Sequence, residues 1–157
     1  MQKITPFLWF DHQAEEAMEF YVSIFPNSKV LSVNRYGPNA PMPEGTVMTA
    51  IFELNGLRFI ALNGGQVYNF SPATSFVVDC EDQAEVDYYW EKLGEGGSYN
   101  RCAWLDDKFG VTWQVVPKQL GGFLSDPDPG RAGRAMQAML QMQKIDIAAL
   151  QHAADAS

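Results

Sequence analysis

Two spacings of apolar residues alternate along the chain: the two-residue period of a β-strand and the 3.6-residue period of an α-helix. A short apolar run precedes each of two stretches with helical spacing, residues 14–25 and 86–93. The triplet Gln13-Ala14-Glu15 opens the first helical stretch and recurs at the second as Gln83-Ala84-Glu85. This pattern predicts a duplicated strand–helix–strand module. Because one such module cannot bury its sheet alone, we expect two copies to close around a shared cleft.

The first module is predicted to contain a strand, a helix and three further strands. The first strand covers residues 4–10, and Asp11 is expected to cap a helix that ends at Pro26. Asn55-Gly56 lies between two apolar runs and is typical of a type I′ hairpin, because both central residues of that turn need positive φ. The remaining strands are expected at residues 28–36, 46–54 and 57–62.

The second module is predicted to repeat this plan in fewer residues. Asp82 and Glu85 form a capping pair at the start of its helix, and Gly94 is expected to cap the end. The remaining segment is shorter than in the first module by about one strand. We therefore expect two strands to run together as one long, bent segment between Ser98 and Leu105, followed by a last strand at residues 111–116.

A helical tail is predicted after Pro117. A helix is expected over residues 132–143, and Asp146 is expected to cap a last helix that runs through His152. This tail is too small to fold alone. We predict one domain of two modules over residues 1–117 (about 3–65 and 74–117), with an extension over residues 118–157 that packs on the modules or on a partner subunit.

Composition narrows the class of protein. A chain of 157 residues with 46% hydrophobic residues is expected to fold as one globular domain. The formal net charge of −8, without a run of Lys or Arg, argues against a nucleic-acid partner. No apolar stretch is long enough for a signal core or a membrane span, so we expect no membrane partner. With only Cys80 and Cys102, a disulfide framework is not expected, and a reducing cytoplasm fits best.

Three segments carry a family likeness: residues 5–11 (TPFLWFD), 61–65 (ALNGG) and 104–114 (WLDDKFGVTWQ). They resemble the PhnB-like branch of the vicinal oxygen chelate superfamily, the relatives of glyoxalases, bleomycin-resistance proteins and extradiol dioxygenases. Residues 125–129 and 144–150 are similar to its subgroup named 3-demethylubiquinone-9 3-methyltransferase. The resemblance implies an α+β fold in which paired βαβββ modules form a cupped mixed sheet, and it implies a homodimer.

The metal ligands that the resemblance implies are missing from the sequence. Metal-dependent relatives carry His or Glu on the first strand of each module and Glu near the end of the last strand. The corresponding positions here are residues 4–6, residues 71–76 and Gln114, which offer no imidazole and no carboxylate. Neutral oxygen ligands bind divalent metals weakly. We therefore expect no metal and no cofactor.

Strand alternation directs Phe7 and Trp9 away from the helix, and it places Thr112, Gln114 and Val116 on one face of the last strand. Gln114 is a polar residue in an apolar strand, and it either orients a ligand or is a satisfied core amide. Aromatic side chains either form the wall of a pocket or pack in the core, and Cys102 is either a pocket residue or a small buried hydrophobe. The expected ligand-binding set is Phe7, Trp9, Asn63, Cys102, Trp104 and Gln114.

Three functions remain open at this point. The first is a PhnB-like protein that binds a small, partly aromatic or apolar molecule in the cup between the modules, without a metal. The alternative is a superfamily enzyme of lyase, isomerase or dioxygenase type with non-standard metal ligands. The methyltransferase of the subgroup name ranks last, because residues 63–65 (Asn-Gly-Gly) lead into a loop rather than into a helix that could hold a methyl donor.

Overall fold

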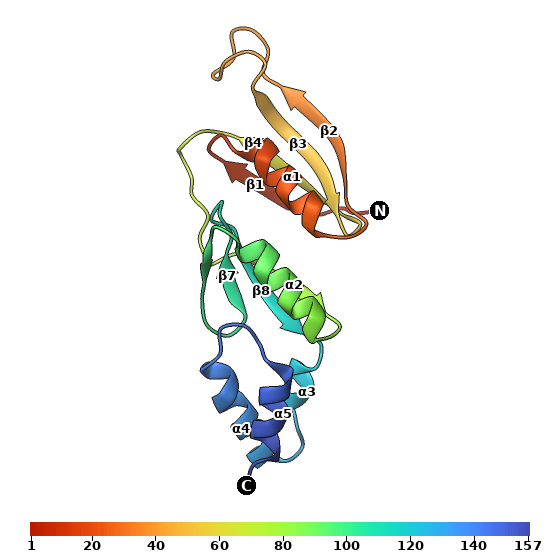
Figure 1. Ribbon diagram of the computed structural model, residues 1–157. Coiled ribbons are helices and arrows are strands. Elements are labelled where there is room, and N and C mark those ends of the chain that lie inside the picture. The colour runs from red at the N-terminus through yellow and green to blue at the C-terminus, as the bar shows by residue number, and fades with distance from the viewer. The chain divides into compact units, whose positions relative to one another are not determined.

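The computed structural model describes residues 1–157, whose helices and strands fall into two compact units, Met1–Phe70 and Ser71–Ser157 (Figure 1). Each unit contains one four-stranded mixed sheet with a helix packed on it. The second unit also contains the helical tail. The fold is therefore α+β, with two βαβββ modules followed by C-terminal helices.

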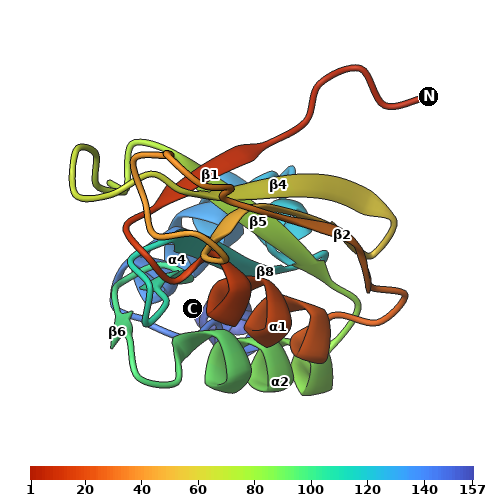
Figure 2. The same cartoon turned by 90° about the horizontal axis from the view of Figure 1, so that it is seen from above.

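The first unit is a sheet in the order β1-β4-β3-β2, in which β1 runs parallel to β4 and the other neighbours are antiparallel. Seen from above, its helix lies along one face of the sheet (Figure 2). Aromatic rings fill the space under the helix, where Phe52 stacks on Phe59 at 5.7 Å between ring centroids and Tyr21 is fully buried. The elements are β1 (Phe7–Phe10), α1 (Ala14–Ile24), β2 (Lys29–Arg35), β3 (Val47–Leu54) and β4 (Leu57–Asn63).

Two details of the first unit differ from the sequence-based expectation, and one agrees with it. The first strand begins at Phe7 rather than at residue 4, and Ile4 is exposed. The residue that precedes α1 is Gln13, and Asp11 makes no cap. The predicted hairpin at Asn55-Gly56 is confirmed, with φ of 49° and 83° at its two central residues.

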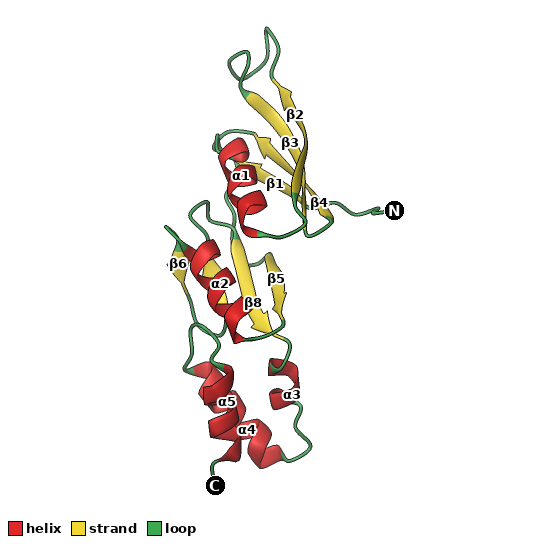
Figure 3. Ribbon diagram, turned by 45° about the vertical axis from the view of Figure 1, so that its right-hand side comes forward, coloured by secondary structure: helices red, strands yellow, loops and turns green.

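The second unit repeats the same sheet plan in the order β5-β8-β7-β6, with β5 parallel to β8. Helix α2 covers one face, visible in Figure 3, and buries Val86, Trp90 and Leu93 against that face. The predicted cap of this helix is confirmed, since the Asp82 carboxylate accepts a hydrogen bond from the backbone N–H of Glu85 at 2.9 Å. The elements are β5 (Ser75–Cys80), α2 (Gln83–Gly94), β6 (Ser98–Tyr99), β7 (Trp104–Asp106) and β8 (Thr112–Pro117).

The prediction of one long, bent strand in the second unit is wrong. Two short antiparallel strands, β6 and β7, are joined by a turn in which Cys102 and Ala103 have φ of 57° and 79°. Neither residue is a glycine, so the sequence carries no usual signal for this turn. Gly94 does not act as the left-handed cap of α2 but is its last residue, and a Cβ there would overlap the ring of Tyr99.

The tail folds as three helices on the second unit: α3 (Leu120–Leu124), α4 (Pro129–Leu140) and α5 (Ile147–Asp155) (Figure 3). The predicted cap of the last helix is confirmed, because the Asp146 carboxylate accepts from the Ala149 N–H at 3.0 Å. Helix α4 begins at Pro129, three residues earlier than expected, with Asp128 as its cap. Helix α3 is only five residues long and is not predicted by the sequence pattern.

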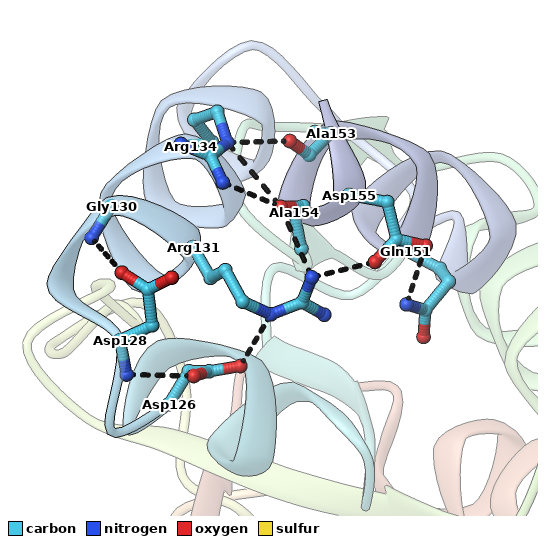
Figure 4. A network of polar contacts seen from close by, with 9 residues as sticks. All are labelled: Asp126, Asp128, Gly130, Arg131, Arg134, Gln151, Ala153, Ala154 and Asp155. Carbon is cyan, nitrogen blue, oxygen red and sulfur yellow. Dashed lines mark hydrogen bonds and ion pairs between the residues drawn. The ribbon is translucent and has the colours of Figure 1, made fainter. Parts of the chain in front are cut away.

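Buried side chains join the tail to the second module. Ile145 and Leu150 are fully buried in one cluster with Leu120 and with Ala103 of the β6–β7 turn. Arg131 bridges the tail helices through Asp126 at 3.0 Å and Asp155 at 2.7 Å (Figure 4). The tail is therefore an integral layer of this unit. None of the helices is both long enough and apolar enough to cross a membrane.

Candidate functional site

Each sheet has one face that its own helix covers and one face that points away from that helix, which we call the open face. Alternation along the paired strands assigns each side chain to one of the two faces. The first open face carries Phe7, Trp9, Thr49, Ile51, Ile60 and Leu62. The second open face carries Ser75, Val77, Trp104, Asp106, Thr112 and Gln114. The centre of the first face is apolar and aromatic, and the polar side chains of Asn34, Glu53 and Arg58 share that face. On the second face, polar side chains lie directly beside Trp104.

Gln114 lies at the centre of the second open face, in the middle of β8. Its neighbours in register are Val77 on β5 and Trp104 on β7. Its Nε2 donates a hydrogen bond to Ser75 Oγ at 2.9 Å, which fixes the orientation of the amide. The side chain is half-buried, and its Oε1 accepts no hydrogen bond within the chain. The structure thus holds one amide carbonyl beside an indole ring, with its acceptor capacity unused.

Two aspartates near this face have different environments. Asp106 lies on the open face and accepts a hydrogen bond from Thr112 Oγ1 at 2.6 Å. Asp107 is only 3% exposed and accepts from the backbone N–H of Val111 and from Trp113 Nε1 at 2.9 Å. Asp107 is therefore a buried, fully bonded carboxylate rather than a solvated loop residue. Its carboxylate organises the turn before β8 and therefore supports the strand that carries Gln114.

The aromatic residues of the first unit are placed on its open face, as the strand pattern predicts. Phe7 is 53% exposed at the start of β1. Trp9 is half-buried and donates a hydrogen bond from Nε1 to Gly65 O at 2.9 Å. Its ring makes an edge-type contact with the Tyr68 ring, with 5.0 Å between the ring centroids. Its ring lies so close to Gly64 that a Cβ at this position would overlap it. The indole N–H of Trp9 is thus used within the fold, while its ring contributes apolar surface.

Asn63 lies on the other side of the sheet, toward α1, and is 2% exposed. Its Oδ1 accepts from the backbone N–H of Ala14 at 2.8 Å, and its Nδ2 donates to Val47 O at 3.0 Å. Both ends of this amide therefore have partners within the fold. This side chain, rather than Asp11, satisfies the first N–H of α1. No local sequence pattern indicates the contact between Asn63 and Ala14, because the two residues are 49 positions apart.

The two cysteines occupy different surroundings. Cys102 lies in the β6–β7 turn, half-buried, and its Sγ is 3.6 Å from Met139 O. The structure does not bring it onto the open face with Gln114. Cys80 is buried under α2, and this burial, together with the nearby carboxylate of Glu85, raises the pKa of its thiol to about 12. Cys80 is therefore held as a neutral thiol at physiological pH.

The residues at the open faces do not fit the metal that the superfamily's fold implies. No group of three or more His, Cys, Asp or Glu side chains is arranged to hold a metal ion. Gln114, for which the family resemblance implies a metal-ligand position, is a neutral amide bonded to Ser75. Divalent metals in proteins prefer charged oxygens, thiolates or imidazoles. Gln114 and Ser75 supply only neutral oxygens, and the nearby carboxylate of Asp106 is bonded to Thr112.

Paired mixed sheets, each with a parallel outer strand and one covering helix, define a fold of the vicinal oxygen chelate type. The fosfomycin resistance protein FosX from Listeria monocytogenes has this fold, with a TM-score of 0.58 at 14% identity, covering 79% of this chain and 97% of that chain. The same protein complexed with Mn(II) and sulfate gives a TM-score of 0.54 at 14% identity, covering 73% and 92%. At this identity, the likeness concerns the fold alone.

The family follows from closer matches. The sequence model of the 3-demethylubiquinone-9 3-methyltransferase family matches residues 2–116. A PhnB protein from Bacillus cereus is 41% identical, with a TM-score of 0.69, covering 74% of this chain and 99% of that chain. A protein from Pseudomonas aeruginosa, at 21% identity, shares the fold alone, with a TM-score of 0.61 and coverage of 74% and 98%. No curated protein matches the chain. The chain belongs to the 3-demethylubiquinone-9 3-methyltransferase (PhnB) family.

Proposed function

We propose that this PhnB-family protein binds a small, partly aromatic or apolar molecule on the open faces of its modules, without a metal. The observation that carries the proposal is the carbonyl of Gln114. Its amide is held by Ser75, its Oε1 is unused, and Trp104 lies next to it in register. Small-molecule sites combine apolar walls with a few fixed polar groups in this way.

The chemistry of the second open face indicates what kind of molecule it accepts. A fixed carbonyl oxygen accepts a hydrogen bond from an N–H or O–H of the ligand, which contributes about 0.5–1.5 kcal/mol. The Trp104 ring provides a flat surface for an aromatic group, and such pairs contribute about 0.5–1.5 kcal/mol beyond the buried area. Ligands with a planar ring and one hydrogen-bond donor therefore match this face best.

Binding without a metal is supported by the donor set. Apart from Gln114 and Ser75, the polar side chains of the second open face include Thr112 and Asp106, which bond to each other, and the exposed Asp79 at the end of β5. Hydrogen bonding and stacking are thus the interactions that these groups supply. The same face gives the superfamily-enzyme hypothesis its one supporting observation, because the Asp106 carboxylate could serve a non-standard cation site. Metal analysis of protein purified without chelator separates metal-free binding from the superfamily-enzyme hypothesis, because a stoichiometric metal ion would favour the enzyme.

The proposal is tested by screening small aromatic amides, phenols and anilines by thermal shift. A ligand at 100 times its Kd stabilises the folded protein by about 2.7 kcal/mol. Gln114→Leu and Trp104→Ala should each weaken a hit about tenfold, whereas the exposed tail substitution Gln141→Leu should not. A ligand that binds both site variants as well as it binds the wild type would refute this placement of the site. Methyl-donor analogues in the same screen test the reaction in the family's name.

We also propose that the chain forms a homodimer. Large apolar side chains are exposed on β2, where Val30 and Leu31 are 45% and 42% exposed. Adjacent exposed apolar side chains of this kind often mark an interface. Light scattering at micromolar concentration should give twice the mass of 17.5 kDa, and a mass equal to that of one chain would refute the dimer.

A further inference from the structure

The turn between β6 and β7 has a backbone conformation that its own residues do not favour. Cys102 and Ala103 are consecutive residues with positive φ, and neither is a glycine. Each such residue is disfavoured by contact between its Cβ and the backbone. Two bonds from the tail hold the turn: Cys102 N donates to Met142 O, and Ala103 N donates to Gln143 O, both at 2.9 Å. The shape of this turn therefore depends on the tail.

The same turn determines where Trp104 lies. Ala103 O accepts from Val115 N at 2.9 Å, so the residue before Trp104 is tied to the residue after Gln114. Trp104 then pairs directly with Gln114 in the β7–β8 register. A movement of the turn would displace the indole ring relative to the Gln114 carbonyl.

One side chain of α2 holds the tail segment that makes these bonds. Gln83 Nε2 donates to Ile145 O at 2.9 Å, and Gln83 Oε1 accepts from Ile147 N at 2.8 Å. The amide thus bonds to the backbone on both sides of Asp146. An ion pair between Lys144 and Asp87 at 3.0 Å supports the same contact.

The equivalent residue of the first module makes no such contact. Gln13 occupies the same place in the repeated triplet, and it precedes α1 without a side-chain cap bond. The family's sequence model ends at residue 116, so the tail segment that Gln83 holds lies outside the matched residues. The contacts between Gln83 and the tail are therefore not explained by the repeated triplet.

We propose that Gln83 is a positioning residue for the ligand site: it clamps the tail at Ile145 and Ile147, and the tail fixes the Cys102–Ala103 turn that sets Trp104 beside Gln114. The link to a ligand rests on the proposed function. The positioning of Trp104 does not, and it can be measured without any ligand.

The test uses the full chain labelled with 5-fluorotryptophan, with Trp104→Phe to assign the Trp104 resonance. In Gln83→Met, which keeps the side-chain length but not the hydrogen bonds, amide exchange at Cys102 and Ala103 should accelerate about tenfold or more. The fluorine resonance of Trp104 should shift or broaden, while that of Trp9 stays in place. Gln83→Glu keeps the acceptor for Ile147 N and should give a smaller change. Gln13→Met is the matched control and should change neither readout.

Unchanged exchange at Cys102 and Ala103, with an unmoved Trp104 resonance in Gln83→Met, would overturn the proposal even if overall stability fell. Should that variant fail to fold, Gln83→Glu is judged by the same two readouts. If the readouts change as expected but no small aromatic molecule binds the wild type, the proposed function fails and the positioning of Trp104 by Gln83 stands. If a ligand is found, Gln83→Met should weaken its binding severalfold, and equal affinity would overturn the role in the site.

Discussion

The two modules share one strand order and one helix position, yet each is completed by a different part of the chain. In the first module, the buried Asn63 amide at the end of β4 supplies the hydrogen bond that starts α1. In the second, the local Asp82 caps α2, and the short β6–β7 hairpin is held by the tail. The topology is therefore conserved between the modules while the contacts that stabilise it are not. The repeated sequence predicts the shared topology but not the contacts that stabilise each module.

The largest effect should come from removing the amide that organises the first module. Asn63→Ala leaves the Ala14 N–H and the Val47 carbonyl buried without partners, which we expect to lower the free energy of unfolding by about 4 kcal/mol. Denaturant unfolding measures this. The control is Asn34→Ala, which removes an exposed amide bonded to Thr49 and should cost less than about 0.5 kcal/mol. Equal losses in both variants would contradict a special role for Asn63.

The next effect tests the tail as an integral part of the second module. Ile145→Ala removes a fully buried side chain from the cluster around Ala103 and Leu150, and should cost about 3 kcal/mol. Hydrogen exchange should show the loss in residues 71–157 and leave residues 1–70 protected. Met136→Ala, on the exposed side of α4, is the control and should be nearly neutral. A loss confined to the tail helices, with β6 and β7 unaffected, would show that the tail is an appendage.

A smaller effect on stability is expected from substitutions at the starts of helices α1 and α2. Asp82→Ala removes the cap of α2 and should cost about 1 kcal/mol. Asp11→Ala should change stability by less than about 0.5 kcal/mol, because the Asp11 carboxylate bonds only to exposed side chains. Thermal or urea unfolding of the two variants gives the comparison. An equal cost would mean that Asp11 caps α1 after all.

The smallest effect is a pH dependence of the tail network in Figure 4. The pKa of Asp126 is lowered by the Asp128 backbone N–H and by Arg131, and that of Asp155 by Gln151 and by Arg131. A carboxylate with a lowered pKa contributes stability above its ordinary pKa of about 4, and this contribution is lost as the pH falls through the folded value. Acid titration followed by tail-specific exchange should show this loss, reduced in Arg131→Met. An unchanged acid transition in that variant would contradict the network's contribution.

Much of the fold could be predicted because periodicity reports directly on which face a side chain occupies. The alternation in residues 7–10 correctly separates Phe7 and Trp9 from Leu8 and Phe10. The alternation around Gln114 separates it from Trp113 and Val115, and the structure shows that Gln114 lies on the face away from the helix. The features that the sequence does not predict have a common physical cause. Asn63, Gln83 and the Cys102–Ala103 turn depend on partners 37 to 64 residues away, which no local pattern contains. Asn63 belongs to the ligand-binding set predicted from the sequence, whereas the structure places its side chain under α1 with both ends of the amide bonded.

The central claim is that a ligand binds through the Gln114 carbonyl and the Trp104 ring without a metal. The most direct measurement is titration calorimetry of a screened ligand with wild type and Gln114→Leu, each with and without a strong chelator. The account predicts the same affinity with and without chelator, and binding about tenfold weaker in Gln114→Leu. Binding that disappears with the chelator, or that is equal in the two proteins, would contradict it.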